Sequence, residues 1–390
     1  MPAALSRRDF LFRSGLIGCS LAASPLLTPV SFAAAPWDTR LVVIILRGGM
    51  DGLDVVQPYG DPAFAALRST LSEGPAGGAH DLDGHFALHP GLGALMPMWR
   101  AGQLGFVHAV STPYRDKRSH FDGQDLLEAG TTSLAGARDG WLNRMLQAVP
   151  GVTAQTAYAI GRDNMRLLTG AAEVANWAPD AELALSPQAE RLLDLVTEPD
   201  AALYAALAEA RLLAASGRAP DKGRAPDHVE VAEFAARQLS GPARIAAFSL
   251  NGWDTHGGQK RALGNALGRL ADTLLTLQDR MEGDTWSKTA VVAMTEFGRT
   301  VRQNGTQGTD HGTGGLMVLA GGAVRGGRVF GQWPGLGDGD LYQDRDLMPT
   351  GDVRAHAAWI MRGLTGLDRT TLEAAVFPGL DMGRDPGLLL

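Results

Sequence analysis

The chain has 390 residues, of which 45% are hydrophobic and 20% are charged, and this is the composition of an ordinary globular protein. A net charge of −7 and the lack of any basic stripe argue against a nucleic-acid-binding protein. The single cysteine, Cys19, lies in the amino-terminal leader, so the rest of the chain is expected to have neither a disulfide nor a thiolate metal site. A chain of this length can instead bury one large core.

Residues 1–35 have the layout of a secretory signal. An Arg-Arg pair at positions 7–8 is followed by Phe-Leu, an apolar stretch spans residues 16–32, and small residues lead to the end of the segment. The pattern resembles a twin-arginine signal, which is a receptor-read address and not an anchor. An ordinary Sec signal is the alternative. We therefore expect a periplasmic or secreted protein that has the twin-arginine export machinery as a partner.

The same apolar stretch raises two other possibilities. Residues 16–19, Leu-Ile-Gly-Cys, resemble a lipoprotein cleavage box, so lipid anchoring at Cys19 is an alternative to release. Ser20, Pro25 and Pro29 interrupt the stretch, and we expect no stable membrane span.

Residues 36–390 are predicted to form a single α/β domain. Unbroken apolar runs at residues 40–46, 243–250 and 289–294 lack the alternation of a strand with one solvated face, so both faces of their sheet should be covered. A helix predicted at residues 261–281 connects the second run to the third, which is the strand–helix–strand unit of a parallel sheet. We therefore predict a three-layer α/β sandwich with a mostly parallel central sheet.

An alanine-rich segment near residues 171–226 is predicted to be a helical insertion beside the sheet. It has many Ala and Leu residues and few β-branched ones, and its last part has the composition of a flexible linker.

Acidic and imidazole side chains follow the carboxyl ends of the apolar runs, where parallel sheets bind their ligands. Asp51 follows the first run, and Glu296 ends the third. Asp254 and His256 follow the second run and point the same way in an extended backbone, because they are two residues apart. A carboxylate and an imidazole on one face suit zinc or a similar divalent ion. We predict that these residues meet in one metal site, although Asp51 could also be a turn aspartate.

Asp310 and His311 lie in the glycine-rich connection after the third run. Adjacent residues of an extended chain face opposite ways, so His311 is the better candidate for direct ligation. Asp310 either ligates as well or fixes the orientation of a histidine. His120 is a further ligand or supporting residue, which we rank below His256 and His311.

Ser119 precedes a helix predicted at residues 122–129, after an apolar run at residues 105–110. The partial positive charge at a helix amino terminus favours an alkoxide or an anionic substrate. Arg118 and Arg299 could neutralise a phosphoryl or sulfuryl group. The alternatives are that Ser119 only caps the helix and that Arg299 forms a surface ion pair with Glu296.

Five motifs together resemble the DUF1501 family, whose members are exported proteins placed with the alkaline phosphatase/sulfatase-like superfamily. The motifs are Leu-Arg-Gly-Gly-Met-Asp-Gly-Leu at 46–53, Arg-Ser-His-Phe at 118–121, Trp-Asp-Thr-His-Gly at 253–257, Thr-Glu-Phe-Gly-Arg-Thr at 295–300 and Gly-Thr-Asp-His-Gly at 308–312. The resemblance implies an alkaline-phosphatase-like fold.

The resemblance also assigns roles to residues. Asp51 would hold one metal, Ser119 would be the attacking group, and a second metal would be held by Asp254, His256 and His311. The related enzymes end the third strand with Asp-His, whereas this chain has Glu-Phe at positions 296–297, so one ligand is missing.

The function implied is that of an exported metal-dependent hydrolase of phosphate or sulfate esters, with a small anionic ester as substrate. Zinc is the leading metal, and manganese, magnesium or calcium also suit acids and imidazoles. Two alternatives are a non-catalytic exported protein that binds a metal or an envelope partner, and an acyl esterase using Ser119. No Gly-x-Ser-x-Gly motif surrounds Ser119, which disfavours the esterase.

Overall fold

The computed structural model describes residues 37–71, 74–115, 117–135, 138–161, 165–179, 197, 204, 207–208 and 225–390. The leader expected at residues 1–35 and most of the helical insertion expected at residues 171–226 lie outside these ranges. The described residues belong to one compact unit, Ala35–Leu390. None of the described helices is both long enough and apolar enough to cross a membrane.

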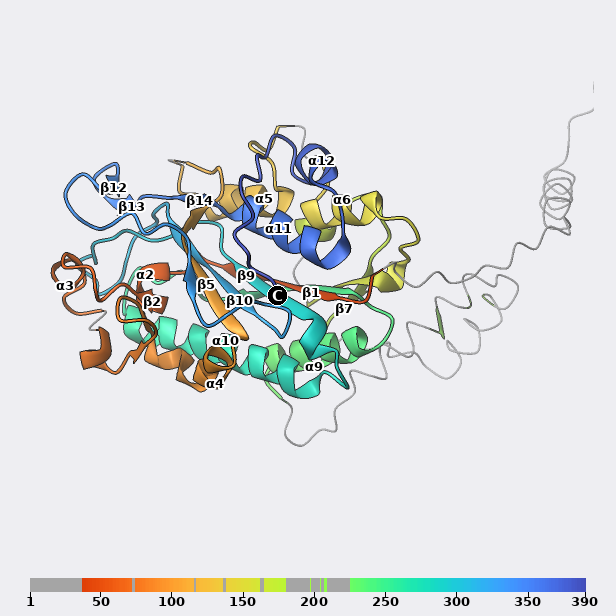
Figure 1. The fold of residues 1–390 in the computed structure, drawn as a ribbon, viewed down its shortest axis with the longest axis horizontal. Helices are drawn as coiled ribbons and strands as arrows, with labels where there is room; N and C mark the ends of the chain where they lie inside the picture. Colours follow the sequence, from red (N-terminus) through yellow and green to blue (C-terminus); the bar gives the residue numbers. More distant parts are fainter. Residues whose placement is uncertain are drawn as a thin grey trace, which may run out of the picture. The chain divides into compact units, whose positions relative to one another are not determined.

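A nine-stranded sheet forms the centre of this unit, in the order β11-β5-β10-β9-β1-β8-β6-β7 with β14 beside β5 (Figure 1). Its strands are β1 Arg40–Arg47, β5 Leu104–Ser111, β6 Ala157–Ile160, β7 Ala175–Trp177, β8 Ile245–Asn251, β9 Thr289–Met294, β10 Gly315–Ala320, β11 Val329–Phe330 and β14 Gly351–Asp352. Strand β10 is antiparallel to both its neighbours, and the other pairings are parallel. The carboxyl ends of β1, β5, β8 and β9 therefore lie at the same edge of the sheet.

Helices cover both faces of the sheet (Figure 1). One layer contains α4 Met96–Arg100, α9 Asp227–Ser240 and α10 Gln259–Arg280, and the other contains α5 His120–Ala129, α6 Trp141–Ala148 and α11 Val353–Thr365. Strand β1 contributes alternate side chains to the two layers, with Val42 and Ile44 on the first side and Val43 and Ile45 on the second. The predicted three-layer sandwich with a mostly parallel sheet is confirmed.

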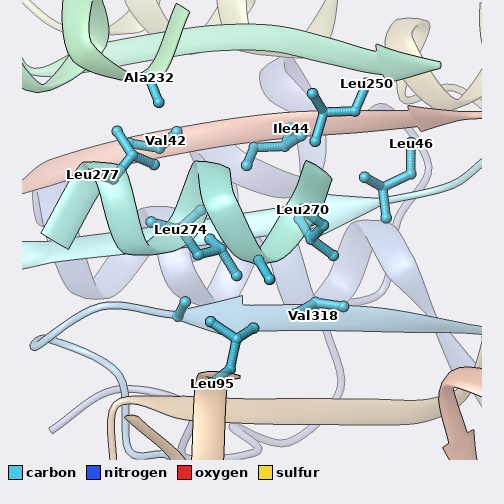
Figure 2. Close-up of a cluster of buried hydrophobic side chains, with 14 of the residues drawn as sticks. Val42, Ile44, Leu46, Leu95, Ala232, Leu250, Leu270, Leu274, Leu277 and Val318 are labelled. Atoms are coloured by element: carbon cyan, nitrogen blue, oxygen red, sulfur yellow. The ribbon is translucent and has the colours of Figure 1, made fainter. Parts of the chain in front are cut away.

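On the side of the sheet covered by α4, α9 and α10, one face of α10 packs on the strands and forms part of a hydrophobic core (Figure 2). Leu270, Leu274 and Leu277 recur at helical spacing and are completely buried beside Val42 and Ile44. Each such leucine contributes roughly 2 kcal/mol by leaving water. Helix α10 connects β8 to β9 along the chain. Its packing on the sheet therefore fixes the positions of these two strands and of the loops at their ends.

Short elements surround the layers. They are α2 Gly52–Val55, β2 Val56–Gln57, α3 Phe64–Leu67, β3 His80–Asp81, β4 Ala87–Leu88, β12 Leu341–Tyr342, β13 Asp346–Leu347, α12 Arg369–Thr371 and a π-helical turn at Leu372–Val376.

Two local predictions are wrong. Residues 175–177 form strand β7 where an alanine-rich helix is predicted, because Trp177 stacks on Phe234 of α9, with ring centroids 4.1 Å apart, and the segment pairs with β6. Helix α5 begins at His120 rather than at residue 122, because Ser119 caps it.

His108 on β5 should make the stability of the fold depend on pH. Burial lowers the pKa of His108 to about 4, and its Nε2 hydrogen-bonds with the backbone oxygen of Val56 at 3.0 Å. The unfolded chain takes up this proton near pH 6.5, whereas the folded chain does so only near pH 4, so stability is lost as the pH falls between these values. We expect the stability difference between pH 7 and pH 4.5, measured by urea unfolding, to be smaller in His108→Gln than in the wild type by about 2 kcal/mol. An unchanged pH dependence in the variant would contradict this.

Candidate metal centre

Glycines allow the loops at the carboxyl edge of the sheet to approach each other closely. Gly48 follows β1 with φ +125°, and a Cβ atom at this position would lie 2.5 Å from the backbone nitrogen of Asp254 after β8. A Cβ on Gly308 would lie 2.4 Å from the backbone of His256. Contacts this short exclude any side chain, so the glycines let the loops after β1, β8 and β9 pack backbone to backbone.

Arg299 holds the same loops together from inside. Its guanidinium is buried and donates to five oxygens: the backbone oxygens of Gly48, Gly49 (2.6 Å), Trp253 (3.2 Å) and Thr309 (3.0 Å), and Oδ1 of Asp254 (2.6 Å). A planar fork with five donors is suited to bridging several acceptors at once. Arg299 therefore fixes Asp254 relative to the β1 loop and to the connection that carries His311.

Three imidazoles and one carboxylate converge at this edge. Ligand atoms of His120, Asp254 and His311 all lie within 4.8 Å of one another. His256 joins them, because its Nε2 lies 2.9 Å from Nε2 of His311 and 3.2 Å from Oδ1 of Asp254. The four residues come from the start of α5, the loop after β8 and the connection before β10, which are far apart in the chain.

Each imidazole is held at Nδ1 by an oxygen acceptor outside the group. Nδ1 of His120 lies 2.7 Å from Oε1 of Glu296, and Nδ1 of His256 lies 3.1 Å from Oδ1 of Asp310. Carboxylates accept hydrogen bonds, so Nδ1 carries the proton in both rings and the neutral ring presents the Nε2 lone pair to the group. Glu296 and Asp310 thus orient two of the imidazoles of the candidate site.

The third imidazole uses a backbone acceptor. Nδ1 of His311 lies 2.9 Å from the backbone oxygen of Arg118. Arg118 has φ +54°, a left-handed conformation that is uncommon for a residue with a side chain. The strained backbone just before α5 is thus the hydrogen-bonding partner of one candidate ligand, while the Arg118 side chain stays exposed.

The group fits a divalent cation. The Nε2 and carboxylate oxygen atoms are separated by 2.9 to 3.5 Å where they contact each other, and tetrahedral ligands around zinc lie roughly 3.3 Å apart. Nε2 of His120 is buried and has no hydrogen-bond partner among the residues that the structure describes. A buried ring nitrogen with a free lone pair, aimed at a carboxylate and other imidazoles, is what a metal ligand requires.

The charges of the surrounding groups also favour a cation. Burial alone would raise the pKa of Asp254, but the hydrogen bond and charge of Arg299 hold it below its usual value. Burial would also raise the pKa of Glu296, but hydrogen bonds from His120, Gln124 and Thr295 hold this pKa below its usual value. Both carboxylates are therefore ionised near neutral pH. The hydrogen bond to Glu296 in turn raises the pKa of His120.

An aromatic ring covers one side of the centre. Phe297 is buried and packs against His120 and His311, with ring centroids 5.0 and 4.9 Å apart, and Tyr114 stacks behind it at 6.1 Å. Phe297 is the residue that stands in place of an expected histidine. In this structure it supports two of the imidazoles instead of contributing a ligand.

The residues proposed as metal ligands from sequence separate into three groups. Asp254, His256 and His311 lie together with His120. Glu296 and Asp310 contact the imidazoles from behind. Asp51 binds Arg68, Gln259 and Thr309 instead, in a buried polar network beside the centre.

The residues proposed as catalytic also differ in position. Ser119 caps α5, accepting a hydrogen bond from the backbone nitrogen of Asp122 at 3.4 Å. Arg118 is exposed and can meet an anion, whereas Arg299 is buried with its donors directed at protein oxygens. The geometry suits Arg299 to positioning Asp254, not to contacting a substrate.

Sequence reasoning ranked His120 below His256 and His311, whereas the structure places His120 in the same group, and it did not single out Arg68. The motif Arg-Ser-His-Phe at 118–121 contained a signal for His120, since the start of a helix at the carboxyl edge of the sheet places its first residues at the site. Nothing in the spacing of Arg68 indicates that it pairs with Asp51.

A family model described as "Protein of unknown function (DUF1501)" matches residues 118–367. The chain belongs to the DUF1501 family. No curated protein sequence matches this DUF1501 chain.

Several solved structures are similar to this DUF1501 chain at low sequence identity. The C-terminal periplasmic domain of EcEptC from Escherichia coli, in complex with zinc, has 11% identity, a TM-score of 0.37 and coverage of 73% of each chain. The lipoteichoic acid synthase LtaP from Listeria monocytogenes has 7% identity and a TM-score of 0.41, with 89% of this chain and 77% of that one covered. A protein in the alkaline phosphatase superfamily from Vibrio parahaemolyticus has 11% identity and a TM-score of 0.37, with 89% and 72% covered. Values this low carry no argument about activity.

Replacing Arg299 should loosen the loops of the DUF1501 centre. Arg299→Lys keeps the charge but cannot supply the planar fork, so several buried carbonyls lose their donor. We expect the free energy of unfolding to fall by about 3 kcal/mol, measured by urea denaturation. Arg302→Lys, at an exposed position three residues away, is the matched control and should change stability little. Equal stability of the two variants would contradict the role given to Arg299.

Replacing Glu296 should weaken metal binding without removing a ligand. Glu296→Gln keeps an oxygen acceptor for Nδ1 of His120 but removes the charge, and such changes typically cost about 10- to 100-fold in metal affinity. Zinc affinity is measured by competition with a chromophoric chelator. Asp125→Asn, at a half-exposed carboxylate on the same helix as His120, is the control and should match the wild type. Unchanged zinc affinity in Glu296→Gln would exclude the supporting role.

Proposed function

We propose that this DUF1501 protein is an exported, metal-dependent hydrolase of phosphate or sulfate esters. The observation that carries the proposal is the convergence of three imidazole Nε2 atoms on Asp254, with every Nδ1 occupied by an acceptor. The Nε2 lone pairs of the imidazoles and the carboxylate oxygens of Asp254 repel one another, and a cation between them would remove that repulsion. Zinc suits a ligand set of imidazole nitrogens and a carboxylate oxygen best, and manganese is the next candidate metal.

The chain's own groups suit an anionic ester. A divalent ion held by His120, His311 and Asp254 would polarise the ester and make an attacking oxygen more acidic. The amino terminus of α5 lies at the candidate centre, because the helix begins at His120, and its free backbone N–H groups favour a negative charge there. The exposed guanidinium of Arg118 is available to pair with a phosphoryl or sulfuryl oxygen.

Ser119 is the proposed attacking group. It stands directly before His120, so its side chain and the metal ligand share the first turn of α5. Its capping hydrogen bond to Asp122 is long, at 3.4 Å, so the hydroxyl is only weakly held in that role. His256, which is about half exposed and oriented by Asp310, is placed to hold or move a proton at its Nε2.

The twin-arginine pattern at positions 7–8 supports export of the folded protein to the periplasm or beyond. Folding before export would allow the metal to be inserted inside the cell. The proposal includes the twin-arginine machinery as a partner.

A non-catalytic metal-binding protein is the second candidate, and one observation favours it. His256 contacts both His311 and Asp254, so it could bind the ion as a fourth protein ligand. Four protein ligands close a tetrahedral zinc site, which is the arrangement of structural rather than catalytic zinc.

Metal removal separates the two candidates. Purified protein is loaded with zinc, assayed on a panel of phosphate, sulfate and carboxyl esters, and assayed again after chelation and after zinc is restored. We expect turnover of phosphate or sulfate esters to fall by at least about 100-fold on chelation and in His311→Ala, and to return with zinc in the wild type only.

His80→Ala is the control, since His80 is exposed on β3 and lies outside the centre. Turnover that survives complete metal removal would exclude the proposed hydrolase. Zinc binding with no turnover of any ester would favour the non-catalytic protein.

A further inference from the structure

Asp51 is a buried carboxylate beside the metal centre, and it already has a cationic partner. It lies in the loop after β1, four residues beyond Arg47, and is completely buried. Nη1 of Arg68 donates to its Oδ2 at 2.6 Å and Nη2 donates to its Oδ1 at 3.0 Å, so the pair is bidentate. The Arg68 side chain is itself completely buried, which makes this an ion pair shielded from water.

Arg68 is anchored independently of Asp51. Its Nε donates to the backbone oxygen of Val301 at 2.6 Å, and Nη2 donates to that of Thr300 at 2.8 Å. These residues directly follow Arg299, the arginine that holds Asp254. The guanidinium is thus fixed by the same connection that builds the metal centre, and it is not a surface group that happens to reach inward.

The remaining hydrogen-bonding capacity of Asp51 is also used. Nε2 of Gln259 donates to Oδ2 of Asp51 at 2.7 Å and to Oδ2 of Asp54 at 2.9 Å. The hydroxyl of Thr309 lies 3.3 Å from Oδ2 of Asp51. The Thr309 hydroxyl has a single proton, which it donates to Oε1 of Gln259 at 2.8 Å. A carboxylate that accepts from an arginine fork and an amide has little capacity left for a metal.

A second divalent cation at Asp51 would also meet like charges. Arg68 contacts Asp51 directly, and the charge of Arg299 is close enough to lower the pKa of the same carboxyl. Arg299 in turn contacts Asp254, so Arg68, Asp51, Arg299 and Asp254 carry charges of alternating sign leading to the imidazoles. In a buried site with weak screening, a dication inserted beside two guanidinium groups is strongly disfavoured.

We propose that the centre binds one divalent ion per chain, and that the guanidinium of Arg68 is a built-in positive charge at the position where Asp51 would otherwise hold a second ion. The inference rests on the proposed metal centre but not on any turnover. It makes the centre a one-ion site, with the ion held by His120, Asp254 and His311 and the charge of Asp51 neutralised by Arg68.

Zinc stoichiometry tests the proposal. Apo-protein is equilibrated with excess zinc, desalted and analysed for metal, and zinc binding is followed by calorimetry. We expect one zinc per chain in the wild type and at least a tenfold loss of affinity in Asp254→Asn. Two ions per wild-type chain would overturn the proposal, whereas no bound zinc at all would instead remove the metal centre on which the proposed function depends.

A second experiment removes the charges of Asp51 and Arg68. Asp51→Asn alone leaves Arg68 buried without its counter-ion and could fail to fold, so the double variant Asp51→Asn/Arg68→Met is used, in which both charges are absent. We expect the double variant to melt closer to the wild type than either single variant does, and to bind one zinc with affinity within threefold of the wild type. Loss of the zinc in a double variant that retains the wild-type circular dichroism spectrum would show that Asp51 is a ligand and overturn the proposal.

Discussion

The buried guanidinium of Arg299 is the interaction on which the candidate site depends. It donates to backbone oxygens in the β1 loop, the β8 loop and the connection before β10, and to the carboxylate of Asp254. Burying a charge is costly unless its hydrogen-bonding groups are satisfied, and here the surrounding loops supply the acceptors. Without this group, the three segments would lose the side chain that contacts all of them.

The acceptors that orient the three imidazoles lie outside the group of atoms that would hold an ion. Glu296, Asp310 and the backbone oxygen of Arg118 each accept from one Nδ1, so the tautomers are set before any ligand arrives. These acceptors come from three separate segments. The centre is therefore a property of the folded sheet edge, and no single segment of the chain could form it.

The strands and the clustering at their ends could be predicted because both depend on local patterns. Unbroken apolar runs identified β1 and β9, and a two-residue spacing placed Asp254 and His256 on one face. Asp51 has a partner that this reasoning did not predict. A carboxylate after a strand has the same sequence pattern whether its partner is a metal or an arginine. Tertiary packing places Arg68 against Asp51, and Arg68 comes from a peripheral segment with no periodic pattern that could have indicated this contact.

The ring of Phe297 covers one side of the centre. It lies against two imidazoles, whose side chains are only 24% and 15% exposed at His120 and His311, while Asp254 and His256 are each 47% exposed. The two more exposed side chains, Asp254 and His256, are therefore the part of the centre that solvent reaches first, while Phe297 covers the opposite imidazoles.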